Sequence, residues 1–253
     1  MSDEELKNFR RSKASMVFQK FALLPHRTVI ENVGYGLQIQ KISEPEINKR
    51  SQHWIDRVGL TGFEGHYPAQ LSGGMQQRVG LARALATDAE ILLMDEAFSA
   101  LDPLIRTDMQ GILLGLQEEL HKTIVFITHD LDEALRIGDE ISILRDGEVV
   151  QQGTSQEIVM DPSDDYIADF IKDVNRARVL EVRSIMEPSK TDNGPRLDLT
   201  TPLEDAMGKL SEAGETSGCV VDDKGHVIGR IELSAAISAI KRPEKTSNEL
   251  RYR

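Results

Sequence analysis

The sequence predicts an α/β fold over residues 1–171, in which short strands alternate with helices, followed by a smaller α+β unit. Two apolar runs of strand length, at 89–96 and 122–130, are each typical of a buried parallel strand that ends in polar residues. A helical pattern at 102–120 separates these two runs. A chain of 253 residues is long enough for one medium domain and a small second one.

The composition fits an ordinary globular protein and argues against several functional classes. No apolar run approaches the roughly 18–20 residues that a membrane span needs, and the first 13 residues have no signal-peptide core. The single cysteine, Cys219, excludes an internal disulfide and is compatible with a reducing cytosol. A net charge of −12 argues against nucleic acid as the main partner, because phosphate binding needs a basic face.

The first elements of the chain are a strand and a long helical region. The run at 14–19 has strand character and stops at Gln19. Residues 28–60 are helical in composition, and within them Ser43 can cap a helix with Pro45 in its first turn.

A Ser-Gly-Gly turn then opens an amphipathic helix at 71–86, with the sequence LSGGMQQRVGLARALA. Ser72 can cap this helix, and the backbones of Gly73 and Gly74 can approach an anion closely. The free N–H groups and the dipole at a helix N-terminus favour a phosphate. Such a turn alone is also consistent with a simple helix cap.

The two strand-like runs end in side chains suited to phosphoryl chemistry. The first, AEILLMDE, ends in Asp95 and Glu96, and the second, KTIVFITHD, reaches His129 near its end. Between them, Asp102 can cap the helix whose first residue is Pro103. Each of these features alone is equally consistent with a structural role.

For the C-terminal part the sequence predicts a hairpin, a helix pair and a small further unit. An Asp-Gly turn in 141–153 predicts a β-hairpin, and 155–171 predicts two helices broken near Pro162. The charged, turn-rich segment 172–200 predicts a linker. A helix, a second hairpin and a short helix follow, and they complete a small unit at 180–241.

Taken together, these motifs resemble the nucleotide-binding subunit of ATP-binding-cassette (ABC) transporters over about residues 1–170. The matching positions are Gln19 for the Q-loop, 71–77 for the signature, 91–96 for the Walker B strand, 99–102 for the D-loop and His129 for the switch histidine. The resemblance implies a P-loop NTPase fold with a helical subdomain at about 30–85. Each motif is weak alone, whereas the ordered set is highly specific.

The resemblance also implies the roles of the individual residues toward ATP and Mg²⁺. Glu96 would be the general base and His129 a hydrogen-bond donor to the transferring phosphoryl group. Asp95 and Gln19 would bind the metal. The residues implied to bind the nucleotide are Gln19, Ser72, Gly73, Gly74, Gln76, Asp95 and Asp102. In the family the signature of one subunit closes on ATP held by the other, which implies a homodimer.

One family motif has no counterpart in this sequence. The phosphate-binding loop Gly-x-x-x-x-Gly-Lys-Ser/Thr should precede Gln19, but only 18 residues do so, and none is glycine. We therefore expect an incomplete, N-terminally truncated domain that binds ATP at least about a thousandfold more weakly. A non-catalytic product or regulatory partner that does not bind ATP by itself is the alternative. A soluble ABC protein of DNA repair or translation is disfavoured by the acidic charge.

Two further stretches point to a type of transporter. Residues 16–38 resemble importers of quaternary amines of the glycine betaine/proline type, and 180–241 resembles one cystathionine-β-synthase-type (CBS) module. The resemblance implies a permease subunit, a substrate-binding protein and a peripheral position on the cytoplasmic face of the plasma membrane. The CBS-like unit would be regulatory, or else an inert appendage. Four apolar residues would be either a partner surface or core: Phe21, Leu23, Leu24 and Val29.

Overall fold

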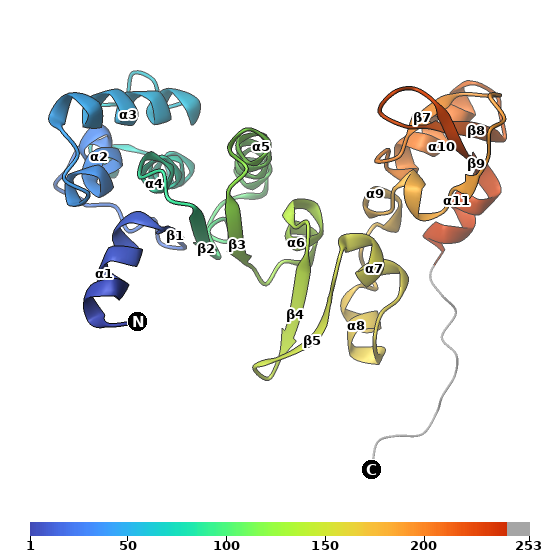
Figure 1. Ribbon diagram of the computed structural model, residues 1–253, viewed down its shortest axis with the longest axis horizontal. Helices are drawn as coiled ribbons and strands as arrows, with labels where there is room; N and C mark the ends of the chain where they lie inside the picture. Colours follow the sequence, from blue (N-terminus) through green and yellow to red (C-terminus); the bar gives the residue numbers. More distant parts are fainter. Residues whose placement is uncertain (242–253) are drawn as a thin grey trace, which may run out of the picture. The chain divides into compact units, whose positions relative to one another are not determined.

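The computed structural model describes residues 1–241 and forms two compact units, Met1–Asp130 and a second that begins at Leu131 (Figure 1). The first unit opens with helix α1 (Asp3–Ser12). Its N-terminus is closed by a capping box, in which the Ser2 hydroxyl accepts from Glu5 N and the Glu5 carboxylate accepts from Ser2 N.

A parallel sheet of three strands forms the centre of the first unit. Its strands are β1 (Ala14–Phe18), β2 (Ile91–Asp95) and β3 (Thr123–Ile127), in the order β1-β2-β3. Phe18 is in register with Asp95, and Asp95 with Ile127, so the carboxyl ends of all three strands meet at one edge. The parallel strands predicted from the sequence are therefore confirmed, and this edge positions the residues that follow each strand.

Strand β3 differs from the sequence prediction, because it is not a buried strand. Val125 and Ile127 on this strand are 48% and 57% exposed, whereas Leu92 and Met94 in β2 are each 1% exposed. The exposure follows the alternation of the strand. Val125 and Ile127 lie on one face and are exposed, whereas Ile124 and Phe126 on the other face are half-buried.

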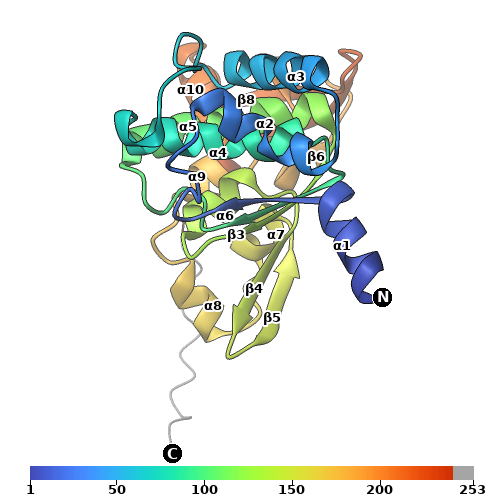
Figure 2. The same cartoon turned by 90° about the vertical axis from the view of Figure 1, so that its left-hand side faces the viewer.

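Helices α2 (Val29–Ile39), α3 (Glu44–Arg57) and α4 (Gly73–Ala86) pack together beside the sheet (Figures 1 and 2). Their shared core contains Val33, Leu37, Ile55, Val79 and Ala82. Ser43 lies at the N-cap of α3 as predicted, but its side chain makes no capping hydrogen bond. The 3-10 turn η1 (Pro68–Gln70) leads into α4.

Helix α5 (Pro103–Leu120) connects β2 to β3 in the way the sequence predicts. Asp102 is its N-cap, with the carboxylate accepting a hydrogen bond from Ile105 N at 3.1 Å, and Pro103 follows directly. His121 is the C-cap of the helix and adopts a left-handed conformation.

The second unit begins with helix α6 (Leu131–Ile137) and the antiparallel hairpin of β4 (Ile141–Arg145) and β5 (Glu148–Gly153). Asp146 and Gly147 at its turn have φ values of 54° and 84°, as the predicted Asp-Gly turn requires. Helices α7 (Ser155–Met160) and α8 (Asp165–Phe170) form the predicted broken pair.

A four-stranded sheet with the order β6-β9-β8-β7 completes the second unit. The sheet strands and the helices around them are, in chain order, α9 (Arg176–Val179), η2 (Val182–Ser184), β6 (Glu187–Pro188), β7 (Arg196–Asp198), α10 (Leu203–Glu212), β8 (Ser217–Val221), β9 (Val227–Glu232) and α11 (Leu233–Ile240). Strands β8 and β9 form the second predicted hairpin.

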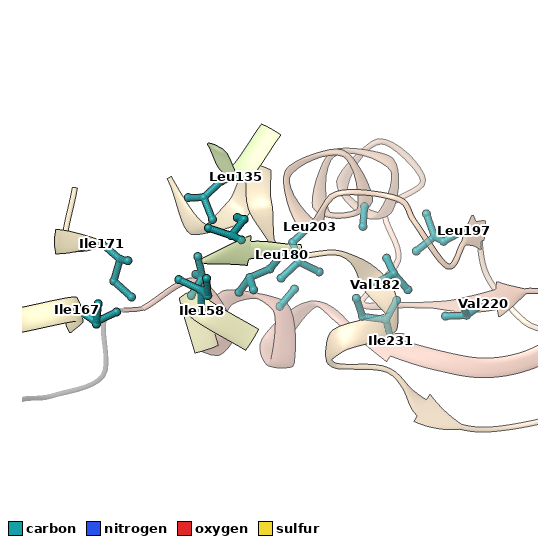
Figure 3. Close-up of a cluster of buried hydrophobic side chains, with 14 of the residues drawn as sticks. Leu135, Ile158, Ile167, Ile171, Leu180, Val182, Leu197, Leu203, Val220 and Ile231 are labelled. Carbon is teal, nitrogen blue, oxygen red and sulfur yellow. The ribbon is translucent and has the colours of Figure 1, made fainter. Parts of the chain in front are cut away.

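One hydrophobic core runs through the second unit (Figure 3). Ile158 and Ile167 from the helix pair belong to the same cluster as Val220 and Ile231 from the sheet. The segment predicted as a linker, 172–200, contains α9, η2, β6 and β7, and it contributes three fully buried residues, Leu180, Val182 and Leu197. It is therefore packed into the core rather than extended. The division predicted from the sequence, into a domain at 1–171, a linker at 172–200 and a small unit at 180–241, stays a prediction.

Within residues 1–241 none of the helices combines the length and apolar character that a membrane crossing requires.

Candidate functional site

Three of the predicted site residues meet at the carboxyl edge of the parallel sheet. Gln19, Glu96 and His129 each follow one of the strands, and the parallel register brings these positions together. The Gln19 amide donates from Nε2 to Glu96 Oε2 at 2.7 Å, and His129 Nδ1 lies 3.2 Å from Glu96 Oε1. Both oxygens of the Glu96 carboxylate are thus held by predicted partners.

The backbone at Glu96 is fixed in an unusual conformation. Its φ is 43°, in the left-handed region that non-glycine residues rarely adopt and that costs about 1–3 kcal/mol. Glu96 N donates to Ile127 O at 2.9 Å, and the Ser99 hydroxyl donates to Glu96 O at 2.9 Å. Strand β3 and the D-loop therefore hold the carboxylate in place.

Ser99 is a functional neighbour that sequence reasoning missed as an individual residue. Its hydroxyl accepts a second hydrogen bond from Gln19 Nε2 at 3.1 Å. The sequence places Ser99 in the D-loop motif, but only the fold brings this hydroxyl to the end of β1.

Arg106 and Asp130 hold the turn that carries His129, and sequence reasoning assigned neither of them a role. Arg106 Nη1 donates to Asp130 Oδ2 at 2.9 Å, and Arg106 Nη2 donates to Ser99 O at 3.4 Å. Asp130 N donates to Thr128 Oγ1 at 3.0 Å, which closes the turn around His129. The side chain of His129 is 70% exposed and so is open to a ligand.

The predicted signature residues form the N-terminus of α4. Ser72 is the N-cap, and its hydroxyl accepts from Met75 N at 3.3 Å, while Gly73 and Gly74 are the first two helical residues. Gln76 folds back, and its amide donates to Pro68 O at 3.1 Å and Leu71 O at 3.2 Å. Gln76 thus shapes the turn that precedes Ser72.

The signature turn touches the rest of the site through apolar contacts. A Cβ atom added to Gly73 would lie 3.7 Å from Phe21 Cζ, and one added to Gly74 only 2.5 Å from Ile105 Cγ2. Phe21 follows Gln19 by two residues, and Ile105 lies in the first turn of α5. The structure therefore links the signature to the Q-loop and to the helix that Asp102 caps.

Asp95 is the exposed last residue of β2, directly before Glu96. Its carboxylate and the Gln19 side-chain oxygen supply hard oxygen donors at neighbouring strand ends, which suits Mg²⁺. These two side chains are the oxygen donors predicted for the metal, and their role stays a prediction.

The apolar residues after Gln19 divide between two environments. Val29 is core, with 1% of its surface exposed, and Leu23 packs against the same cluster. Phe21 and Leu24 are half-buried. A partner surface at this segment stays a prediction.

Comparison with known proteins agrees with this geometry. The ABC transporter family model matches residues 1–99. The trimethylamine N-oxide transport system ATP-binding protein TmoW of Pelagibacter ubique is 42% identical, over 97% of this chain and 72% of its own length. The chain belongs to the ATP-binding proteins of the ABC transporter family.

Other relatives of this ABC protein confirm the fold. The glycine betaine transport ATP-binding protein OpuAA of Bacillus subtilis is 52% identical over 94% of this chain, which spans 56% of the length of OpuAA. The dimeric ATP-binding cassette MJ0796, solved with ADP and Pi, has 40% identity and a TM-score of 0.55, covering 61% of this chain and 68% of that one. The predicted α/β fold of the ABC ATPase type is therefore confirmed.

Proposed function

We propose that this chain is the ATP-hydrolysing component of an importer for glycine betaine, proline or a related quaternary amine, in a form that lacks the phosphate-binding loop. The observation that carries the proposal is the Glu96 carboxylate, which Gln19 and His129 hold from opposite oxygens at 2.7 and 3.2 Å. A carboxylate fixed at a strand end beside a second carboxylate is suited to activate a water for attack on a phosphoryl group.

The roles of the three residues follow from their chemistry. Glu96 is the general base that takes a proton from the attacking water. His129, with an exposed ring next to Glu96, donates a hydrogen bond to the transferring phosphoryl group. Gln19 orients the Glu96 carboxylate, since its amide nitrogen donates to that carboxylate and to Ser99.

Asp95 and Gln19 are the residues that would hold Mg²⁺. The Gln19 nitrogen is engaged with Glu96 and Ser99, which leaves its oxygen as the donor for a cation. When bound, the ion neutralises charge that develops on the phosphates.

The signature residues would bind the γ-phosphate of ATP held by a second ATP-binding subunit, one that carries the phosphate-binding loop. Ser72, Gly73 and Gly74 present the N-terminus of the 14-residue helix α4, where N–H groups and the helix dipole favour an anion. In this role Gln76 shapes the turn and Asp102 fixes the D-loop end against α5. The dimeric cassette among the related structures supports a homodimer.

The substrate class and partners are proposed from the relatives. OpuAA is named for glycine betaine and TmoW for trimethylamine N-oxide, and both compounds carry a methylated, positively charged nitrogen. The importer would include an integral membrane permease and a substrate-binding protein, with this chain peripheral on the cytoplasmic face of the membrane. In this proposal residues 180–241 are a CBS-like regulatory module. Nucleic acid is not among the proposed partners, because the net charge is −12.

The test uses the importer isolated from its host through this chain and reconstituted in liposomes with its binding protein. ATP hydrolysis and uptake of labelled glycine betaine, proline or trimethylamine N-oxide are measured together. Glu96→Gln should lower kcat about a hundredfold or more while nucleotide binding persists. Glu118→Gln, the same charge change at an exposed position of α5, serves as the matched control.

Two results would contradict the proposal. Unchanged hydrolysis in Glu96→Gln would remove the general-base assignment. Absence of hydrolysis in the wild-type complex would favour the alternative of a regulatory partner without catalytic activity.

A further inference from the structure

We propose that Arg83 is a positioning residue that holds the Gln19 amide against Glu96 by clamping the turn at 20–22 to the signature helix. The inference rests on the proposed function of Gln19 in hydrolysis. It starts from the chain immediately after Gln19. Phe21 and Ala22 have φ values of 56° and 46°, so two consecutive residues with side chains occupy the left-handed region. Such a turn needs support from its surroundings.

The turn has little support of its own. Phe21 N donates to Phe18 O at 3.2 Å, and Ala22 N donates to Lys20 O at 2.5 Å, which are local contacts only. Gln19 and Lys20 are exposed, and Ala22 is exposed as well. A contact from another element is therefore required to keep the two left-handed residues in place.

Arg83 supplies that contact. Its Nη1 donates to Ala22 O at 2.6 Å, and its Nη2 donates to Phe21 O at 3.0 Å. A planar guanidinium can bond two neighbouring carbonyls at once, and the charged donor makes both hydrogen bonds stronger than neutral ones. Burial lowers the pKa of the Arg83 side chain because desolvation penalises its charge, yet an arginine stays protonated at neutral pH.

The clamp also joins the turn to the signature. Arg83 lies in α4, the helix that begins at Gly73. The Phe21 ring reaches to 3.7 Å from the Cβ position of Gly73, and Phe21 O lies 3.6 Å from the Cβ position of Gly80. Phe21 therefore runs along α4 from its first turn toward Arg83, and a displacement of this helix would be transmitted to the residue two places after Gln19.

Arg78 offers a matched control on the same helix. Its Nη1 donates to Val58 O at 3.2 Å, so it too joins α4 to a backbone carbonyl by a guanidinium. Val58 is the C-cap residue of α3 and belongs to the core of the helical layer. Loss of Arg78 should affect packing of the helical layer and leave Gln19 in place.

The experiment compares the wild-type 253-residue chain with Arg83→Ala, Arg83→Lys and Arg78→Ala. Hydrogen exchange is measured at the backbone amides of residues 21–24. The side-chain amide resonance of Gln19 is followed by NMR and is identified by its loss in Gln19→Ala. In Arg83→Ala we expect exchange about tenfold or more faster and a shifted Gln19 resonance. Arg83→Lys keeps the charge but lacks the planar pair of donors, so its exchange rates and Gln19 shift should lie between those of the wild type and Arg83→Ala. Arg78→Ala should match the wild type.

The proposal is overturned if both readouts in Arg83→Ala equal those of the wild type, or if exchange rises while the Gln19 resonance stays in place. Should Arg83→Ala fail to fold, Arg83→Lys decides by the same two criteria. In the hydrolysing complex we expect kcat to fall about tenfold with KM for ATP unchanged, and an unchanged kcat would also overturn it. Exchange and NMR need no nucleotide. A complex without ATPase activity would thus count against the proposed function and not against the clamp.

Discussion

Gly74 and Ile105 are in direct contact, and the contact leaves no room for a side chain on the glycine. A Cβ atom on Gly74 would lie 2.5 Å from Ile105 Cγ2, closer than real Cβ atoms approach their neighbours. The first turn of α4 and the first turn of α5 are thereby set against each other. The second glycine of the signature is therefore required by packing as well as by access for a phosphate.

Replacing Gly74 by alanine should destabilise the first unit by about 1–3 kcal/mol, the usual cost of overpacking. Ile105 is β-branched and its Cγ2 cannot swing away freely, so the helix ends must separate. Urea unfolding measures the change. Gly73→Ala is the control, since its Cβ would stand at an ordinary 3.7 Å from Phe21 Cζ. Adding Ile105→Ala to Gly74→Ala should recover part of the loss, and no recovery would contradict the steric explanation.

Replacing His129 by alanine should reduce kcat for ATP by about a hundred- to a thousandfold, the usual cost of removing one donor to a developing charge. KM should change little, because His129 is proposed to act on the transferring phosphoryl group in the transition state. Steady-state hydrolysis by the reconstituted importer provides both constants. A raised KM with normal kcat would instead make His129 a residue that only binds ATP.

Acidification should loosen the start of α2 through Glu31. The Glu31 carboxylate accepts from Thr28 N at 2.8 Å and Thr28 Oγ1 at 3.1 Å, and these hydrogen bonds, the backbone one first, lower the pKa of Glu31 below its ordinary value of 4.5. The folded state thus favours the charged form. Its contribution is present above about pH 4.5 and disappears as the pH falls through the lower pKa of the folded state.

The measurement is the free energy of unfolding from about pH 6 to about pH 3. The wild type should lose more stability over this range than Glu31→Gln, which cannot titrate at this position. Glu118→Gln controls for the loss of one exposed carboxylate. Equal pH dependence in the wild type and Glu31→Gln would show that the capping box contributes nothing through its charge.

The 253-residue chain by itself should bind ATP–Mg²⁺ only at about millimolar concentrations or above. The sequence contains no Gly-x-x-x-x-Gly-Lys-Ser/Thr loop, whose charge-assisted hydrogen bonds are each worth roughly 1.5–3 kcal/mol. Isothermal titration on the purified chain tests this. Micromolar binding would mean that other groups of the chain replace the loop.

Much of the fold was predictable because local signals and tertiary structure agree. The strands at 14–19 and 91–96, the Asp102 cap of α5 and the Asp-Gly hairpin all follow from short-range rules. The exposure of β3 did not, because an apolar run predicts a strand but not which of its two faces is covered. The buried Leu180, Val182 and Leu197 also escaped prediction, since isolated apolar residues in a turn-rich segment carry no periodicity.

The site was predictable as a set of motifs and not as a network. The sequence identifies Gln19, Glu96 and His129, and the structure shows the contacts that join them. The contacts of Arg83 and Arg106 could not be predicted, because their partners are backbone carbonyls or a distant carboxylate. The sequence position of Arg83 is nevertheless unusual. A charged residue inside the apolar run of LARALA is a place to look for a buried hydrogen bond.

The single core of the second unit has a consequence for how this part of the protein can evolve. Leu180 and Val182 bury their side chains in the same cluster as Ile158 on one side and Ile231 on the other. We therefore expect the helix pair and the four-stranded sheet to unfold together in one cooperative transition. Recombination that exchanged the sheet between related genes would leave half of a core behind. We expect such an exchange to need compensating changes in α7 and α8, so that the two parts would evolve as a pair.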